Sequence, residues 1–370
     1  MTFITAFLFI IGFILLLVGA ELLVRGASTL AESAGISPLV VGLTVVAYGT
    51  SAPELAVTVR SVLSSTPQSD LALGNVIGSN ISNILLVLGI SAIVAPLTVS
   101  RQLVRGSVPF MILTSIGALA LCWDGTLDQS EGLFLFFVAM IYTGFAIYQS
   151  RRETAAAMLN SEENEETPTV TRSQKWKRFG IQIGLMIAGL AMLLIGANWL
   201  VEGAVSVAKY LGVSEMIIGL TVVAVGTSLP EVATSIVAAM RGQRDIAVGN
   251  VVGSNIFNIL LVLGIAGASA PSPIVVSDAA RFFDMPFMIA VSAACLPIFF
   301  TQFEISRGEG ALFLSYYIGY TTYLFLQATE HDALQPFSTI MFTFVVPLTA
   351  VTLVFATLRA MRNNLRTIRD

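Results

Sequence analysis

Charged residues are scarce in this sequence of 370 residues. Asp, Glu, Lys and Arg make up 11% of it, while apolar residues make up 55%. A water-soluble domain carries roughly 25% charged residues, because polar groups must cover its surface. The charges are also clustered here, so that long stretches carry none. This composition excludes an ordinary soluble domain and is typical of a protein whose main solvent is lipid.

Cysteine and histidine are nearly absent as well. Cys122 and Cys295 each lie inside an apolar run, which favours two small buried side chains. The single histidine, His331, lies in a polar connection and is interpreted as solvated. The sequence contains no nucleophile–base pair and no His-rich metal motif, and its net charge of −4 is mild. It therefore predicts no enzyme, no cofactor, no nucleic-acid partner and no obligate protein partner.

Long apolar runs dominate the chain. A helix needs about 20 apolar residues to cross a bilayer, and eleven stretches qualify: 2–24, 36–63, 70–95, 107–123, 131–149, 179–201, 213–240, 245–269, 285–302, 309–327 and 337–358. The first is not interpreted as a signal peptide, because no basic residue precedes it and Arg25 follows it. An all-α polytopic membrane protein is expected.

Basic residues are unevenly distributed between the two ends of these spans. With the N-terminus outside, all of the 19 basic residues except Arg60, Lys209 and Arg281 fall on inner connections or in the C-terminal tail. Positive charge accumulates on the cytosolic side of membrane proteins. We therefore predict a multi-pass protein of the plasma (cytoplasmic) membrane, with the N-terminus outside and the tail in the cytosol.

The longest connection, 150–178, is polar and contains an acidic run, Glu162, Glu163, Glu165 and Glu166. We interpret it as a flexible cytosolic linker, since it has no ligand spacing of the EF-hand kind. It divides the chain into a first set of five spans (1–149) and a second set (179–327). Residues 328–370 add an eleventh span and an Arg-rich tail.

The two sets of spans repeat one another. The block Gly-Leu-Thr-Val-Val-Ala-Tyr-Gly-Thr-Ser-Ala-Pro-Glu, at 42–54, recurs almost unchanged at 219–231. The block Gly-Asn-Val-Ile-Gly-Ser-Asn-Ile-Ser-Asn-Ile-Leu-Leu-Val-Leu-Gly, at 74–89, recurs at 249–264. Five spans separate each block from its copy, and five is odd, so the copies cross the membrane in opposite directions. Inverted repeats of this kind are a transporter architecture, with the substrate site near the midplane.

Two glutamates lie well inside these apolar spans. A carboxylate at the bilayer centre costs roughly 3 kcal/mol on insertion scales, so Glu54 and Glu231 must face a partner or a cation. Each shares a helical face with an Ala, a Thr and a Ser. These residues are Ala47, Thr50 and Ser51 in the first repeat, and Ala224, Thr227 and Ser228 in the second. The duplication favours a cation site over packing.

A proline directly precedes each glutamate. Pro53 lacks an N–H group and clashes with the carbonyl of Gly49, and Pro230 repeats this arrangement with Gly226. A kink is expected at each proline, with backbone carbonyls freed nearby. Free carbonyls at membrane depth are tolerated where they line a cavity.

The next span of each repeat adds more oxygen ligands. Ser79 and Asn83 are four residues apart, as are Ser254 and Asn258. The neighbouring Asn80 and Asn255 point about 100° away from those serines; they are candidate ligands or, alternatively, hold a helix break. For the flanking glycines, such as Gly74 and Gly78, close helix packing is the competing interpretation.

Hard oxygen ligands of this kind select Na⁺, Ca²⁺ or Mg²⁺ over softer metals. Two carboxylates carry a charge of about −2, which one Ca²⁺ or two Na⁺ would balance. Because loading by one ion then excludes the other, the set suits exchange.

These blocks resemble the alpha-repeats of the sodium/calcium exchanger branch of the calcium/cation antiporter superfamily. The resemblance extends over residues 2–327, with alpha-repeats at about 36–95 and 213–269. It implies ten core helices in two inverted sets of five, and alternating access by sliding of the first and sixth spans. It also implies that Na⁺ and Ca²⁺ are held by Glu54 and Glu231, by carbonyls at the two alanine positions, and by the Thr, Ser and Asn residues named above.

Two features depart from the family pattern. In potassium-dependent members an acidic residue stands at the position of Asn258, so that potassium dependence is not expected here. The eleventh span exceeds the ten-helix pattern.

Three functions remain open at the level of the residues. Na⁺-driven Ca²⁺ antiport, with extrusion as the usual direction, is the leading hypothesis. Ca²⁺/H⁺ antiport is the alternative, because the same glutamates can carry protons. A cation channel is the third, and the inverted halves argue against it.

Overall fold

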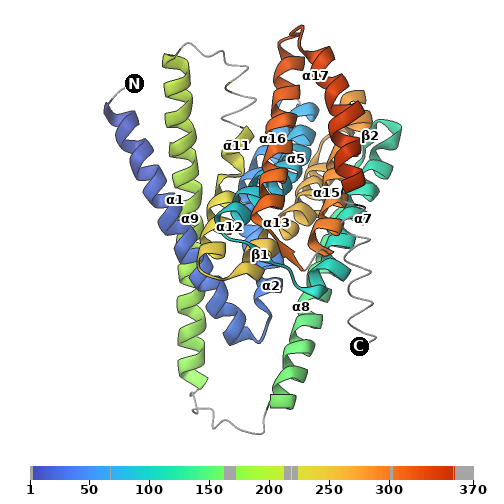
Figure 1. The fold of residues 1–370 in the computed structure, drawn as a ribbon. Coiled ribbons are helices and arrows are strands. Elements are labelled where there is room, and N and C mark those ends of the chain that lie inside the picture. The colour runs from blue at the N-terminus through green and yellow to red at the C-terminus, as the bar shows by residue number, and fades with distance from the viewer. Residues whose placement is uncertain are drawn as a thin grey trace.

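Helices make up nearly all of the chain that the structure describes (Figure 1). The structure is a computed structural model, and it describes residues 3–66, 68–161, 172–211, 218, 224–300, 303–352 and 354. Segments labelled η are π-helical, except η4, which is a 3-10 turn. The predicted all-α polytopic membrane architecture is confirmed.

The first half follows the five expected spans. Its elements are α1 (Phe3–Ala34), α2 (Pro38–Val41), η1 (Gly42–Val46), α3 (Ala47–Thr50), α4 (Ala52–Val62), α5 (Ser69–Ser82), η2 (Asn83–Leu88), α6 (Gly89–Val94), β1 (Leu97–Thr98), η3 (Leu103–Ser107), α7 (Val108–Leu121), η4 (Cys122–Asp124), β2 (Thr126–Leu127) and α8 (Gln129–Ser161).

The described part of the second half follows the same order, and residues 213–217 and 219–223 of the predicted span 213–240 lie outside it. It consists of α9 (Arg172–Tyr210), α11 (Ala224–Thr227), α12 (Leu229–Met240), α13 (Arg244–Phe257), η6 (Asn258–Leu263), α14 (Gly264–Ser269), β3 (Ile274–Val275), η7 (Ala280–Asp284), α15 (Met285–Phe300), β4 (Glu304–Ile305) and α16 (Arg307–Ala328). The chain then continues into α17 (Leu334–Ile340) and η8 (Met341–Val345).

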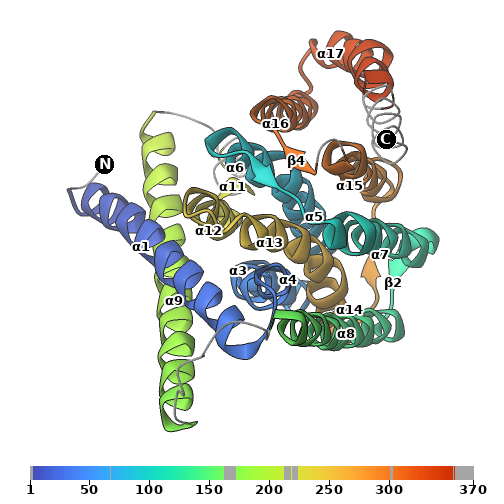
Figure 2. The same cartoon turned by 60° about the horizontal axis from the view of Figure 1, so that its bottom comes forward.

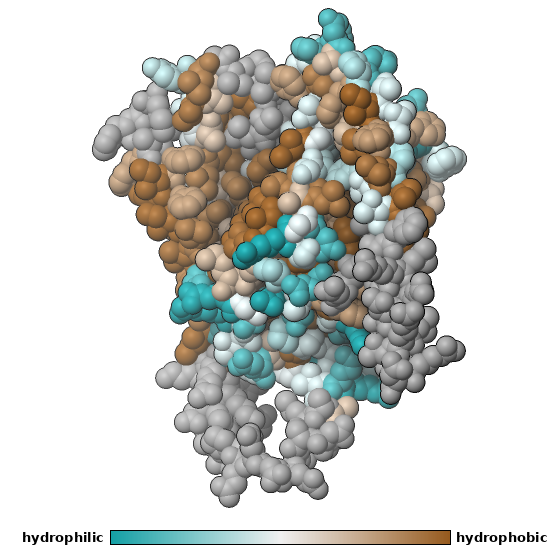
Figure 3. Space-filling model, in the orientation of Figure 1, coloured by the Kyte–Doolittle hydropathy of each residue, from teal (hydrophilic) through white to brown (hydrophobic). Residues whose placement is uncertain are grey.

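Eight helices in the described part of the chain are long and apolar enough to span a membrane, and a bent pair makes a ninth candidate. Apolar side chains gather in a broad band on the face shown in Figure 3. The bent pair consists of 38–50 and 52–62, which meet at 46°. The break falls at Ser51, between Gly49 and Pro53, where the sequence predicts a kink. In the second half α11 and α12 are likewise separated at Ser228, before Pro230.

Several helices are longer than the apolar runs predict. Helix α8 extends to Ser161 and α9 begins at Arg172, so both ends of the expected 150–178 linker are helical. A helix satisfies its own backbone hydrogen bonds and can continue into water where Ala, Arg and Glu, which form helices readily, follow the apolar run. The acidic run at 162–166 and the basic tail beyond Arg359 lie outside the described residues.

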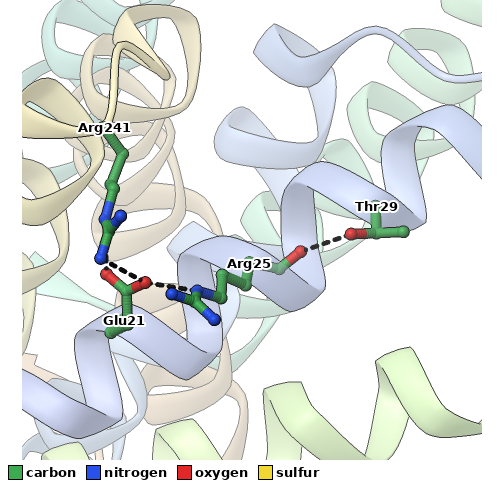
Figure 4. A network of polar contacts seen from close by, with 4 residues as sticks. All are labelled: Glu21, Arg25, Thr29 and Arg241. Carbon is green, nitrogen blue, oxygen red and sulfur yellow. Dashed lines mark hydrogen bonds and ion pairs between the residues drawn. The ribbon is translucent and has the colours of Figure 1, made fainter.

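Helices α1 and α9 form a crossed pair and run in opposite directions, as the inverted repeat requires (Figures 1 and 2). They meet at glycines. A side-chain carbon at Gly19 would lie 2.7 Å from the carbonyl oxygen of Gly189, and one at Gly196 would lie 2.7 Å from that of Gly12. An ion pair between Glu21 and Arg241, 2.8 Å long, also ties α1 to the end of α12, and Glu21 bonds Arg25 on its own helix (Figure 4).

The fifth helix of each half packs against the opposite half. Helix α8 lies against α14 through Gly132, and α16 lies against α6 through Gly310. The short strands follow the same rule, since β1 pairs antiparallel with β4 and β2 with β3. These reciprocal contacts relate the two halves and interlock them.

The eleventh helical segment, α17 with η8, lies at the edge of the molecule beside α15 and α16 (Figure 2). The Tyr316 hydroxyl donates a hydrogen bond to Thr349 Oγ1 at 2.7 Å, and Phe342 contacts Phe283 edge to face. Much of its apolar surface is exposed. This segment is therefore a peripheral addition to the helix bundle, packed against α15 and α16.

We predict that Gly132→Ala destabilises the interlocked halves. Its new methyl group would lie 2.3 Å from the backbone nitrogen of Ala268, and such overpacking costs about 1–3 kcal/mol. Gly144→Ala, on the same helix, meets no atom within 4 Å and serves as the control. Thermal unfolding in detergent should show a lower midpoint for Gly132→Ala alone, and equal midpoints for the two variants would contradict the contact.

Candidate ion-binding site

The two glutamates each lie in the first turn of a helix that begins in mid-membrane. Glu54 lies in the first turn of α4, directly after the break at Ser51, and Glu231 lies in that of α12, after Ser228. The side chains are 1% and 0% exposed. The amino-terminal end of a helix carries partial positive charge, so each break places a favourable dipole beside a buried carboxylate.

Hydrogen bonds bring the halves together at these carboxylates. Ser51 Oγ, from the first half, donates to Glu231 Oε1 at 3.4 Å, and Ser79 Oγ donates to Glu54 Oε1 at 3.5 Å. Because Ser51 lies three residues before Glu54, its bond to Glu231 places both carboxylates in the same region. The structure thus joins residues that are far apart in the sequence into one polar centre.

The asparagines reach this centre from opposite sides. Asn83 opens η2, which packs against α12, and Asn258 opens η6, which packs against α4. Each asparagine therefore lies on an element that faces the glutamate helix of the other half. Both are fully buried, as is Ser254.

Many polar atoms of this centre have no hydrogen-bond partner among the described residues. They are Glu54 Oε2, Glu231 Oε2, Ser228 Oγ, Ser254 Oγ, and both amide atoms of Asn83 and of Asn258. A buried polar group left unsatisfied costs about 1–3 kcal/mol, and a charged group costs more. Oxygens gathered in this way, two of them from carboxylates, are the ligands that a hard cation requires.

No basic side chain compensates the carboxylates. Within the described ranges, Glu54 and Glu231 are the only charged residues that are buried. Nor do those ranges contain a cluster of three His, Cys, Asp or Glu residues that could hold a metal ion. The charge of the centre therefore has to be balanced by ions that enter it, as substrates, or by protons.

Asn75 and Asn250 bond to residues of the site and hold them in place, a role that the sequence patterns did not predict. Asn75 Nδ2 donates to the Glu54 carbonyl at 3.0 Å and to Thr58 Oγ1 at 2.9 Å. Asn250 Nδ2 donates to Ser235 Oγ at 3.1 Å, and its Oδ1 accepts from Thr50 Oγ1 at 3.1 Å. The signal was present in the sequence, because a Gly-Asn pair opens both copies of the second block.

Asn80 and Asn255 are engaged with the backbone. Asn80 Nδ2 donates to the Asn255 carbonyl at 3.3 Å, and Asn255 Nδ2 donates to the Val251 carbonyl at 3.0 Å. These bonds favour the interpretation that the pair holds the helices, although the Oδ1 atom of each has no partner in the described part of the chain.

The alanine and threonine positions differ between the halves. The Ala47 carbonyl is not free, since it accepts the Ser51 N–H at 3.0 Å and the Thr50 hydroxyl at 3.5 Å. Ala224 opens α11, and Thr227 is half-buried. A ligand role for both carbonyls stays a prediction.

A cavity of about 730 Å³ leads toward this centre. We call it the α5 cavity; its polar lining consists of Asp70, Asn75, Ser79, Ser82, Thr227, Ser277, Asp284, Tyr317, Tyr320 and Thr321. Ser79 belongs both to the cavity wall and to the hydrogen bond with Glu54. The centre is therefore approached from the end of the molecule where α5 begins.

Two inverted halves around a buried, oxygen-lined centre define a membrane transporter of cations. The family model of the sodium/calcium exchanger protein matches residues 4–148 and 181–326. The chain belongs to that family, which consists of exchangers and not of enzymes. It is a multi-pass membrane protein of the cation/Ca²⁺ exchanger type.

Individual relatives agree with this assignment. The chain is 36% identical to the inner membrane protein YrbG of Escherichia coli, over 78% of this chain and 87% of that one. It is 32% identical to the sodium/calcium exchanger MaX1 of Methanosarcina acetivorans, over 80% and 91%. A solved structure of the sodium-calcium exchanger NCX_Mj matches with a TM-score of 0.71 and 31% identity, over 86% of this chain and 98% of that one.

We predict that Glu54→Gln and Glu231→Gln each abolish binding of Ca²⁺, because each removes one of the two charges that balance the ion. Glu202→Gln is the control, since Glu202 is exposed on α9. Equilibrium binding of radioactive calcium to purified protein measures the effect. Wild-type binding by both Gln variants, in folded protein, would remove the glutamates from the site. Loss of expression of both would instead assign them a structural role.

Proposed function

We propose that this chain exchanges Na⁺ for Ca²⁺ across the membrane by alternating access, with Ca²⁺ extrusion as the usual direction. The observation that carries the proposal is the set of buried carboxylate, hydroxyl and amide atoms between the two halves that have no partner among the described residues. One Ca²⁺ or two Na⁺ would neutralise the two carboxylates. The two ions then compete for one centre, which couples their movements.

The ligands we propose are Glu54, Glu231, Ser51, Ser228, Thr50, Thr227, Ser79, Ser254, Asn83 and Asn258, with carbonyls of Ala47 and Ala224. Relatives that carry the names of sodium/calcium exchangers, MaX1 and NCX_Mj, support Na⁺ as the coupling ion. We keep the predicted orientation, with the N-terminus outside and the linker and tail in the cytosol. In that orientation the α5 cavity opens to the outside, because α1 begins at the same end of the molecule (Figure 1).

A sodium-gradient flux assay tests the coupling ion. Proteoliposomes loaded with Na⁺ should take up radioactive calcium when the gradient is imposed, and dissipating the gradient with an ionophore should stop the uptake. Uptake that follows a pH gradient equally well without Na⁺ would replace the proposal with Ca²⁺/H⁺ antiport. Single-channel currents in a planar bilayer would replace it with a channel.

We also expect Asn258→Asp to change ion coupling more than folding. The new carboxylate would raise the charge of the centre from about −2 to about −3, so that a further monovalent cation is needed for balance. Flux should be measured with and without K⁺, which the wild-type protein is not expected to require. Asn83→Asp, the equivalent change in the first repeat, is the matched comparison. Unchanged ion dependence in both variants would count against these positions as ligands.

A further inference from the structure

The two copies of the repeat blocks differ at only a few positions. The first block differs at Tyr48, where the second copy has Val225, and at 52 and 229. The second block differs at Ser82, where the second copy has Phe257, and at 77 and 252. Two of these differences place an aromatic ring in one copy and none in the other.

These two rings come from opposite halves and meet. The ring centroids of Tyr48 and Phe257 are 3.9 Å apart. The Tyr48 hydroxyl bonds Thr143 Oγ1 at 2.9 Å, which fixes the ring against α8. Phe257 is completely buried. It also meets Tyr142 edge to face, with a centroid distance of 6.4 Å.

Tyr142, which Phe257 meets, lines a second cavity. We call it the α8 cavity; its volume is about 560 Å³, and Val40, Leu43, Gln102, Ser107, Phe110 and Tyr142 are among its lining residues. Phe110 stacks on Tyr142 at 4.5 Å, so Phe110, Tyr142, Phe257 and Tyr48 form a wall of rings in contact, of which Phe110 and Tyr142 line the cavity. Ser107 and Tyr142 of its lining correspond in the repeat to Asp284 and Tyr320, which line the α5 cavity.

The backbones of α13 and of the α2–η1 segment also pack closely on this side of the centre. A side-chain carbon at Gly249 would lie 2.7 Å from the Leu39 carbonyl oxygen, and one at Gly253 would lie 2.4 Å from that of Leu43. The equivalent glycines of the first half, Gly74 and Gly78, meet no atom of the described residues within 4 Å and line the α5 cavity. In the described part of the chain, the close backbone contact thus lies on the α8 side, whereas the cavity that reaches Ser79 lies on the α5 side.

The α5 side keeps only part of the aromatic arrangement. Phe287 stacks on Tyr320 at 4.9 Å, as Phe110 does on Tyr142. The two rings that complete the wall are missing, because Val225 and Ser82 occupy their positions. Ser82 instead lines the cavity.

We propose that Tyr48 and Phe257 form a gate on one side of the ion-binding centre, and that the gate on the other side, at Val225 and Ser82, is weaker. The proposal rests on the transport function proposed above. Burial of Phe257 against the Tyr48 ring stabilises the arrangement that is closed on the α8 side. Closure of the α5 side gains no equivalent contact. The centre is thus exposed preferentially to the α5 cavity, and the two membrane faces are not equivalent to the ion.

Cysteine labelling in detergent micelles tests this inequality. Cys122 and Cys295, both buried and unpaired with each other, are first replaced by alanine. Thr321→Cys then reports on the α5 cavity, which Thr321 lines. Ala139→Cys reports on the closed side. Ala139 is 0% exposed, and its counterpart in the repeat, Tyr317, lines the α5 cavity.

Phe257→Ser and Tyr48→Val each give the gate the residue of the other half. We expect both to slow labelling in the Thr321→Cys background and to speed labelling in the Ala139→Cys background, changing the ratio of the two rates by about tenfold. Ile77→Val exchanges a residue between the same blocks without altering a ring and should leave the ratio unchanged. Tyr48→Phe keeps the ring and should restore most of the wild-type ratio.

Wild-type ratios for Phe257→Ser and Tyr48→Val, in protein that elutes as the wild type does on size exclusion, would overturn the gate. If Phe257→Ser does not fold, the comparison of Tyr48→Val with Tyr48→Phe decides the matter. No ion gradient is used in the labelling, so the labelling can support the gate proposal even when sodium-driven uptake is absent. Equally, the labelling can contradict the gate proposal even when sodium-driven uptake is present.

Discussion

A carboxylate that is buried at membrane depth without a basic partner determines most of this structure. Hydrocarbon supplies neither water nor counter-charge, so Glu54 and Glu231 are tolerable only if protein dipoles and mobile cations stabilise them. The helix breaks at Ser51 and Ser228 place helix amino termini beside the carboxylates. The serine and asparagine side chains then bring further polar atoms to the same place.

The inverted repeat solves a second part of this problem. One half supplies one glutamate and one Ser/Asn helix, which alone would leave a single charge among a few hydroxyls. Ser51 reaches Glu231 across the boundary between the halves, and Asn250 accepts a hydrogen bond from Thr50 in the same way. Each half therefore completes the polar surroundings of the other half's carboxylate, and the centre lies at the boundary between them.

Much of this could be predicted from the sequence, because membrane helices leave clear signals. The apolar runs predicted the helices, and the pairing of Gly49 with Pro53 located the break in the second span. The glutamates were evident as duplicated charges in apolar surroundings. The helical ends of the linker were not predicted, since hydropathy marks where lipid ends and not where a helix ends.

Features that depend on contacts between distant residues could not be predicted in this way. The sequence patterns assigned no role to Asn75 and Asn250, and only their bonds to Thr58, Ser235 and Thr50 place them beside the site. The π-helical segments η2 and η6 likewise leave no periodic signal. The difference between Ser82 and Phe257 is visible in the sequence, but only the structure shows that Phe257 meets Tyr48.

The reciprocal packing of the fifth helices also bears on how the chain assembles during synthesis. Helix α8 is complete at Ser161, whereas its partner α14 begins only at Gly264. Until then the glycine face of α8 at Gly132 has lipid or another chain as its neighbour. The packing of the first half is thus incomplete in the membrane until the second half has been inserted and α14 lies against α8.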